Sequence, residues 1–302
     1  MRGLRKYLTP FAPDQSGAVS VLYELGGLIA ICDAGGCTGN VCGFDEPRWF
    51  EQKSALFSAG LRDMDAILGR DDRLVEKLVD AASKLDVKFV AIIGTPVPAV
   101  IGTDYKALGR MCEKRLNMPV ITIDTDGMEL YDVGEEKAWL ELFGTFAEKG
   151  KPNLDIEKKR GKIGVLGLTP QDISDLRAPK KIREYYQEKE GKEAICYCMG
   201  ENVCRSTYGL DNHRTAGEVE KNIVVSPAAL ATAKYLEKTF GTPYEVTYPI
   251  VEELVPDMDY RGKKILIVHQ QVIGNAMRAE IRGRCQKVNG DPSVDNNAVI
   301  TV

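Results

Sequence analysis

The sequence predicts an α/β protein built from successive Rossmann-like units, each a parallel sheet covered by helices. Short apolar runs alternate with amphipathic stretches along the 302 residues, which is typical of strand–helix–strand units. Hydrophobic residues make up 44% of the chain, enough for sizeable cores. A charged stretch that contains a proline, 151–161, has little to bury and divides the pattern into two parts. We interpret it as a linker.

The first unit, residues 1–155, is expected to hold four strands and three helices. Leu74, Leu78 and Ala82 recur every three or four residues, which places them on one face of a helix. The expected strands are Leu28–Cys32, Ser54–Ser58, Phe89–Ile93 and Val120–Ile123. The expected helices are Arg73–Leu85, Tyr105–Arg115 and Glu135–Lys149.

The second unit, residues 156–260, repeats the pattern, and a third unit, residues 261–302, is expected to be incomplete. Proline in the first turn and Gly241 after the last residue mark the ends of one helix, Pro227–Phe240. The other expected elements are the helices Pro179–Glu190 and Ile273–Arg284 and the strands Lys162–Gly167, Glu193–Met199, Ile223–Val225, Tyr244–Thr247, Lys264–His269 and Ala298–Val302.

Composition excludes several classes of function. The net charge is −4 and the charges are mixed along the chain, so neither nucleic acid nor an anionic membrane surface is an expected partner. No stretch approaches the roughly 20 apolar residues of a membrane span, and the N-terminus lacks the apolar run of a signal peptide. We therefore expect a cytoplasmic protein. Its eight cysteines are then expected to be reduced thiols or metal ligands, whereas two histidines are too few for zinc or non-haem iron sites built on several histidines.

The most informative segment is a cysteine- and glycine-rich loop after the first strand. It holds Cys32, Cys37 and Cys42 together with four glycines in twelve residues. Loops at the carboxyl end of parallel strands are where α/β folds bind ligands. Thiolates suit soft metals, above all iron–sulfur clusters, so the loop predicts metal-linked redox chemistry.

Each thiol also has an ordinary structural interpretation. Cys37 could be a small residue in a tight turn, although its place in the loop favours a metal ligand. Cys32 ends a strand and is equally well explained as a small buried hydrophobic residue. Cys42, too, is equally well explained as a metal ligand and as an ordinary structural residue.

Two other groups leave alternatives open. Cys196, Cys198 and Cys204, with His213 beyond them, could bind a metal, but inert thiols on a buried strand explain them better. The charged residues that follow the Cys-rich loop form either a docking edge or proton relay, or an ordinary salt-bridged surface, and we favour the surface slightly. They are Asp45, Glu46 and Arg48, followed by Trp49.

Several segments together resemble the nitrogenase component 1 family, over nearly the whole chain. The most specific segment runs from Asp33 through the Cys-rich loop to Trp49. The others are Gly94-Thr95-Pro96 followed by Ile101-Gly102-Thr103-Asp104, Lys162-Ile-Gly-Val-Leu-Gly, Val225-Ser226-Pro227, Phe240-Gly241-Thr242-Pro243-Tyr244, and Lys264-Ile-Leu-Ile-Val-His-Gln-Gln. The short nitrogenase-like members of the family are the most similar.

The resemblance implies a subunit that pairs with a copy of itself or a sibling, with a cluster at the interface. It also implies an ATP-hydrolysing iron protein as electron donor. The family's interfacial cluster is held by three cysteines per subunit. Cys37 matches one of them, whereas the others would fall near Ser16–Gly17 and at Thr95-Pro96, where this chain has no cysteine. The cysteine that binds the nitrogenase cofactor would fall near Ser226, so we do not expect dinitrogen reduction.

These observations predict an iron–sulfur cluster of the [4Fe–4S] type between two chains. In a symmetric dimer each chain would contribute Cys37 with Cys42 or Cys32, and Gly36 and Thr95 would lie beside the cluster. The predicted function is a nitrogenase-like oxidoreductase component that relays low-potential electrons to an unknown substrate. The alternative is a scaffold or carrier that assembles a metal cofactor or tetrapyrrole without turnover. A binder that keeps the fold but holds no cluster is a third reading.

Overall fold

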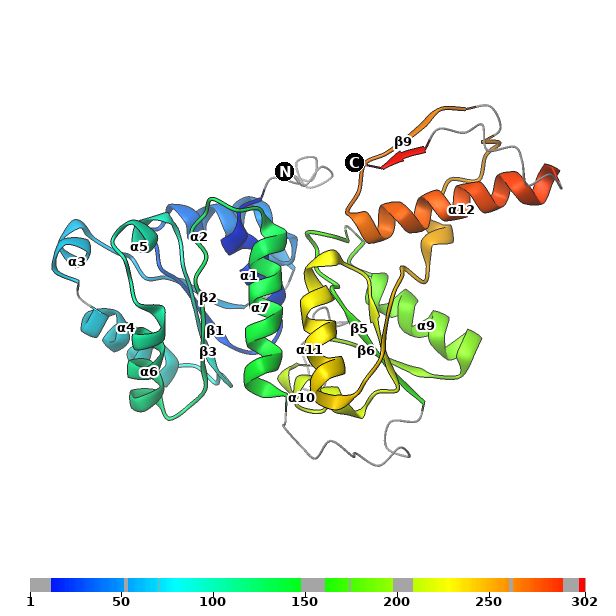
Figure 1. Ribbon diagram of the computed structural model, residues 1–302. Coiled ribbons are helices and arrows are strands. Elements are labelled where there is room, and N and C mark those ends of the chain that lie inside the picture. The colour runs from blue at the N-terminus through cyan, green and yellow to red at the C-terminus, as the bar shows by residue number, and fades with distance from the viewer. Residues whose placement is uncertain are drawn as a thin grey trace.

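A computed structural model gives the fold and describes residues 12–51, 54–69, 71–147, 161–173, 175–197, 209–260, 263–289 and 299–301. Two four-stranded sheets, in which every strand pair is parallel, stand side by side with helices on their faces (Figure 1). The predicted α/β fold is therefore confirmed.

The first sheet has the strand order β2-β1-β3-β4. Its strands are β1 (Leu28–Ile31), β2 (Ala55–Ser58), β3 (Val90–Ile93) and β4 (Val120–Ile123). β1 and β3 are buried on both faces, as their unbroken apolar runs require. One face packs against α4 (Asp71–Ser83) and α6 (Tyr105–Leu116), and the other against α1 (Asp14–Leu22) and α7 (Tyr131–Phe146).

The second sheet has the order β6-β5-β7-β8. Its strands are β5 (Lys162–Leu166), β6 (Glu193–Cys196), β7 (Lys221–Val224) and β8 (Tyr244–Val246). The helix α9 (Ala178–Glu190) covers the outer face, and α10 (Leu210–Arg214) and α11 (Leu230–Phe240) cover the face toward the first sheet.

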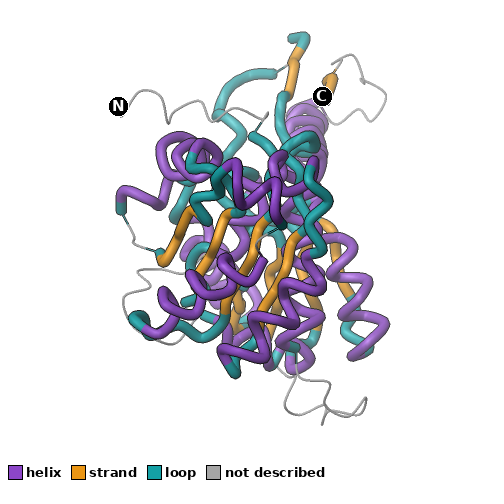
Figure 2. Tube along the Cα trace, turned by 90° about the vertical axis from the view of Figure 1, so that its left-hand side faces the viewer, coloured by secondary structure: helices purple, strands orange, loops and turns teal. Residues whose placement is uncertain are grey.

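A single apolar core fills the space between the two sheets. It contains residues of α1 and α7 as well as of α10 and α11, and Figure 1 shows these helices as a layer between the strands of the two sheets. Figure 2, turned by 90°, shows strands running side by side through the middle of the molecule with helices around them. The ring of Phe143 stacks on Trp139 at 6.0 Å between centroids and meets Tyr197 of the second unit edge-on at 5.1 Å. The two sheets thus share one core.

Two glycines allow α1 and α7 to cross closely. A Cβ atom on Gly17 would lie 1.9 Å from the carbonyl oxygen of Tyr131, and one on Gly134 would lie 1.8 Å from that of Asp14. Real Cβ atoms cannot approach backbone so closely, so the crossing requires glycine on both helices.

The remaining elements lie at the edges of the sheets and beyond the second unit. The longest helix, α12 (Gln271–Asn289), packs against the second unit through Ile273, and β9 (Ile265–Ile267) pairs with β10 (Val299–Thr301) in parallel. Short elements are α2 (Gly36–Asn40), η2 (Val41–Asp45), η3 (Pro47–Phe50), α3 (Asp63–Leu68), α5 (Pro96–Val100), η4 (Ala216–Glu218), η5 (Pro227–Ala229) and η6 (Val251–Glu253).

The structure differs from expectation in a few elements. The sequence analysis missed α1, because all nine of its residues are buried and it therefore lacks a polar stripe. The predicted helix Glu135–Lys149 begins earlier, at Tyr131. The predicted limits between units, 155/156 and 260/261, fall at segments outside the described residues and stay predictions.

Candidate functional site

The Cys-rich segment lies at the carboxyl edge of the first sheet and is largely helical rather than an open loop. Gly35 turns the chain after β1 with φ at +117°, a value that favours glycine, and α2 follows. The helix then widens into the π-helical turn η2, which contains Cys42. Such turns are rare and often occur at functional sites.

Two carboxylates fix the ends of this segment. Asp33 accepts hydrogen bonds from the backbone N–H of Thr38 at 2.7 Å and from the Ser58 hydroxyl at 2.5 Å. At the other end, Asp45 Oδ2 accepts from Ser16 and Asn40, both at 2.7 Å. The segment is therefore held in place independently of any bound group.

Cys37 and Cys42 are half-exposed on this segment. Burial, followed by the charge of Asp33, raises the pKa of Cys37, and a hydrogen bond with Thr95 partly opposes the rise. Burial and the charge of Glu46 raise the pKa of Cys42. Both groups are therefore neutral thiols at pH 7, and a bound metal would have to displace their protons.

Cys32 lies on the opposite face of the sheet from Cys37. It belongs to the core beneath α4 and α6, whereas Cys37 packs against the core shared by the two sheets. Cys32 also borders a cavity of about 230 Å³ that is lined by Asp65, Asp71 and Asp104. Burial and nearby negative charge raise the pKa of Cys32 to about 12. The structure does not bring Cys32 together with Cys37.

Thr95 connects this edge of the sheet to the Cys-rich segment. Its side chain is fully buried, and its hydroxyl donates to the carbonyl oxygen of Cys32 at 2.6 Å. The residue lies close enough to Cys37 to hydrogen bond with the thiol. Thr95 thus lies beside Cys37, and its place beside a cluster stays a prediction.

The glycines of the segment leave space around the thiols. A Cβ atom on Gly36, Gly39 or Gly43 would meet no other atom within 4 Å. The packing of the described residues thus gives no reason for glycine at these three positions. Small residues allow something outside the chain to approach the backbone closely, which fits a ligand or a partner surface.

Apolar side chains are exposed around the same edge. They follow three neighbouring strands of the first sheet, whose carboxyl ends meet there. The exposed residues are Phe44 after β1, Val97, Val100 and Ile101 after β3, and Met128 and Leu130 after β4. An apolar surface of this kind marks an interaction site when its members are contiguous.

The charged residues behind the segment form a buried ion-pair network and not an exposed edge. Arg48 is 2% exposed and pairs with Glu46 at 2.7 Å and with Glu24 at 3.3 Å. It also donates to the carbonyl oxygen of Ser20 at 2.6 Å. Neither a docking edge nor a salt-bridged surface describes this group, because its charges are out of contact with solvent.

The second thiol group is only partly within the described residues. Cys196 is buried in the outer core of the second sheet, and Cys198 and Cys204 lie outside the described residues. His213 lies on the other face of that sheet, 4.9 Å from the ring of Phe143 between centroids, and burial lowers its pKa to about 3. Cys196 and His213 therefore do not share a site.

No three His, Cys, Asp or Glu residues among those described come together in a way that could hold a metal ion. Among the described residues, the half-exposed thiols of this segment are Cys37 and Cys42. A cluster with four thiolate ligands would need two more ligands besides this pair.

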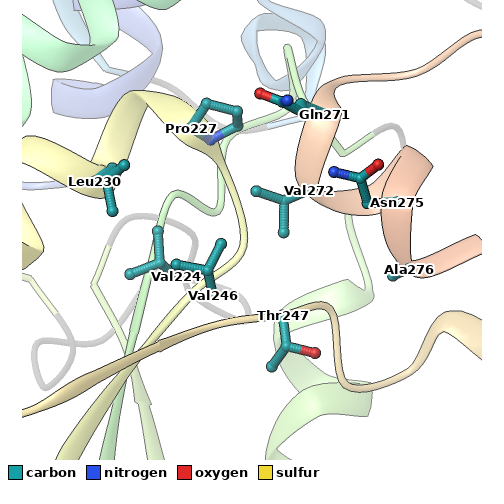
Figure 3. A pocket seen from close by; sticks show the side chains of 9 residues that line it. All are labelled: Val224, Pro227, Leu230, Val246, Thr247, Gln271, Val272, Asn275 and Ala276. Atoms are coloured by element: carbon teal, nitrogen blue, oxygen red, sulfur yellow. The ribbon is translucent and has the colours of Figure 1, made fainter. Parts of the chain in front are cut away.

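A separate cavity of about 350 Å³ opens at the carboxyl edge of the second sheet (Figure 3). The ends of β7 and β8 and the first turns of α11 and α12 enclose it. Its lining residues are uncharged: Val224, Pro227, Leu230, Val246, Thr247, Gln271, Val272, Asn275 and Ala276. Such a lining suits a neutral ligand.

Comparison with known proteins identifies the family. The model of nitrogenase component 1 type oxidoreductases matches residues 16–251, more than three quarters of the chain. This chain belongs to that family. The sequence resemblance is therefore confirmed.

Two relatives are nitrogenase iron-molybdenum cofactor biosynthesis proteins NifE. The protein from Bradyrhizobium diazoefficiens is 23% identical over 194 residues, which cover 62% of this chain and 32% of the relative. The protein from Clostridium pasteurianum is 26% identical over 200 residues, which cover 65% of this chain and 40% of the relative. The matches thus span less than half the length of either relative.

Solved structures of nitrogenase Cp1 share the fold. The structure at pH 6.5 has a TM-score of 0.61 and 18% identity, and the match covers 82% of this chain and 48% of that chain. The structure at pH 5 gives the same score and identity and covers 50% of that chain. No helix among the described residues of the present chain is long and apolar enough to span a membrane.

Sequence reasoning missed the buried polar residues that hold the site in shape. The pattern of the sequence indicated neither the ion pairs of Arg48 nor the role of Asp33 as an anchor. Asp33, just before the glycines, was one available signal, because aspartate often accepts hydrogen bonds from backbone N–H groups near the start of a helix. The paired carboxyl groups Glu135 and Asp172 gave no such signal, since they are 37 positions apart and meet only in the fold.

Proposed function

We propose that this chain is a cluster-carrying component of a nitrogenase-like reductase. In this proposal Cys37 and Cys42 from each of two identical chains hold one [4Fe–4S] cluster at their interface. Members of the family bind metal–sulfur clusters. The observation that carries the proposal is the pair of half-exposed thiols on a fixed helical segment, beside glycines where an added Cβ would meet no neighbouring group of the described residues within 4 Å.

The exposed apolar residues at the same edge support the second chain as partner. Phe44 follows Cys42 by two residues, and Val100 and Met128 lie on the loops after β3 and β4. Burying such side chains contributes about 25 cal/mol for each Å² removed from water. A dimer through this edge would cover the thiols and exclude water from the cluster.

A bound cluster would supply a one-electron relay, accepting an electron from an ATP-hydrolysing iron protein and passing it to a substrate. The chain's own residues supply the fixed frame. Asp33 and Asp45 hold the helical segment, and Thr95 holds the end of β1 against β3. Cys32 is left out of the ligand set, because it faces the other side of the sheet.

A scaffold is the second candidate, and the relatives favour it. Both NifE proteins are by name cofactor biosynthesis proteins. In that role the chain would hold a metal cofactor or tetrapyrrole and release it to an acceptor, without turnover. The neutral cavity beside α12 offers a place for a substrate or cargo in either case.

The test is iron and sulfide analysis of anaerobically purified protein, with native mass and EPR before and after dithionite. About four iron atoms per dimer and a signal on reduction are expected. Cys37→Ala should lose the iron, whereas Cys112→Ala, which removes a buried thiol of α6, should keep it. A monomer without iron that cannot be reconstituted would contradict the proposal.

One further measurement separates reductase from scaffold. In a reductase, added substrate takes electrons from the reduced cluster and so oxidises it, and repeated turnover needs the iron protein. A scaffold loses its bound metal to an acceptor protein, and its metal content falls by a stoichiometric amount.

A further inference from the structure

Two buried carboxyl groups lie near each other where the first unit contacts the second, since the Thr169 hydroxyl donates to Glu135 and accepts from the backbone N–H of Asp172. Glu135 lies in the first turns of α7 and is 0% exposed, and Asp172 follows β5 and is 6% exposed. The Thr169 hydroxyl donates to Glu135 Oε1 at 2.6 Å, and the Tyr131 hydroxyl donates to Asp172 Oδ1 at 2.8 Å. Each unit therefore donates one hydrogen bond to the carboxyl group of the other.

The second oxygen of each group lacks a hydrogen bond. Glu135 Oε2 and Asp172 Oδ2 are buried and have no hydrogen-bond partner among the described residues. A buried carboxylate oxygen without a donor costs about 1–3 kcal/mol, and more when it is charged. A single proton held between the two groups would supply the missing donor.

The surrounding charges do not neutralise the pair. Arg48 of η3, a buried cation whose charge acts on Glu135, is already paired with Glu46 and Glu24. Asp132 on α7 adds negative charge, and the buried carboxyl of Asp14 lies on α1, which crosses α7 at Gly134. The Ser226 hydroxyl, beside Asp172, carries no charge.

Burial raises the pKa of both carboxyl groups. Desolvation, followed by the charge of Asp172, raises the pKa of Glu135 well above its ordinary value. Desolvation raises the pKa of Asp172 to about 6, against the nearby hydroxyl groups of Ser226 and Tyr131, which favour its ionised form. Two adjacent buried carboxyl groups cannot both ionise easily.

We propose that Glu135 and Asp172 share one proton at neutral pH, and that this proton fastens the first unit to the second. The shared proton converts two repelling charges into a carboxyl–carboxylate hydrogen bond across the junction. Removing it leaves two like charges in a dry contact. The junction is then a pH-sensitive device that weakens as the pH rises.

The direction in which stability changes with pH follows from how tightly the folded and unfolded states bind the proton. The folded state binds the proton more tightly than the unfolded state, so unfolding near pH 7 releases it. The stability that the pair contributes is fully present below about pH 4, which is where the carboxyl groups of an unfolded chain titrate. It falls as the pH rises through the value of about 6 for Asp172 and continues to fall until Glu135 ionises.

The test compares the wild type with Glu135→Gln and with Glu136→Gln, whose side chain is exposed on the next residue of the same helix. Infrared spectra at pH 7 should show the carbonyl band of a protonated carboxyl group in the wild type and in Glu136→Gln, and not in Glu135→Gln. Calorimetric unfolding in buffers of different ionisation enthalpy should release about one proton fewer for Glu135→Gln.

A wild type without the carbonyl band at pH 7, or equal proton release in all three proteins, would overturn the proposal. If Glu135→Gln does not fold, the wild-type band is followed with pH instead. Loss of that band at alkaline pH together with a lower unfolding temperature supports the shared proton. A band that persists while the protein unfolds overturns its role at the junction.

Discussion

The hydroxyl of Thr95 donates a hydrogen bond of 2.6 Å to the carbonyl oxygen of Cys32, and so connects the chain just beyond β3 to the residue that follows β1. Cys32 N–H in turn donates to the carbonyl oxygen of Ile93 at 2.8 Å. The two strands are thus joined at the edge where the Cys-rich segment begins. Replacing Thr95 by Val keeps the shape of the side chain and removes the donor.

We therefore expect Thr95→Val to lower the free energy of unfolding by about 1–3 kcal/mol, since a buried carbonyl loses its side-chain donor. Thr95→Ser keeps the hydroxyl and should cost less. Chemical denaturation of both variants checks the difference. Equal stability of the wild type and Thr95→Val would show that the hydrogen bond contributes nothing.

Cys32→Ser and Cys42→Ser should differ in iron content, because the two thiols lie in different surroundings. Cys42 is half-exposed on the helical segment, and its loss should remove the cluster of the proposed dimer. Cys32 is buried in the outer core, so Cys32→Ser should keep iron while losing stability. Iron analysis and thermal unfolding of the same samples test both expectations. Loss of iron in Cys32→Ser but not in Cys42→Ser would show that Cys32, and not Cys42, is the ligand.

Arg48→Met should destabilise the fold by about 3–5 kcal/mol, because it leaves the buried carboxylates of Glu46 and Glu24 without their cation. Arg73→Met is the matched control. Arg73 is largely exposed and pairs with Asp65 at 3.4 Å, so its loss should cost less than about 1 kcal/mol. Urea denaturation of both variants measures the free energy of unfolding that each one loses. Similar losses would show that the buried ion pairs of Arg48 stabilise the fold no more than the exposed one of Arg73.

Gly17→Ala should force α1 away from α7, because its Cβ would lie 1.9 Å from the Tyr131 carbonyl oxygen. We expect a loss of at least about 3 kcal/mol, at the severe end for a single substitution. Gly144→Ala, on α7 with nothing within 4 Å of its Cβ, should instead stabilise the protein by about 1 kcal/mol. Thermal unfolding separates the two, and tolerance of Gly17→Ala would contradict the close crossing.

His213 should make the protein sensitive to acid. Its pKa is lowered to about 3 by burial against Phe143 and Tyr197, whereas an unfolded histidine titrates near 6.5. The unfolded state therefore binds more protons in this range, and stability falls as the pH drops below about 6.5. His213→Phe should flatten the dependence of unfolding temperature on pH between 6.5 and 4. An unchanged slope would mean that His213 is not buried as a neutral ring.

Strands were the easiest elements to predict, and buried contacts between distant residues the hardest. β1 and β3 are continuous apolar runs, because a parallel sheet buries both of their faces. The helix α1 has no such pattern, since it is enclosed by α7 and the first sheet. Residue types alone indicated Cys37 and Cys42, but only the fold shows that Cys32 faces the other way.

The shared core between the two sheets limits how the molecule can respond to a ligand. Two domains joined by a polar contact can close around a substrate by rotating about a hinge. Here Trp139 and Phe143 of α7 pack into the same apolar interior as Leu236 and Phe240 of α11. A rotation would have to open that interior to water. The pair of sheets therefore behaves as a rigid block, and whatever reaches its carboxyl edges must enter by the movement of surface loops or of a partner.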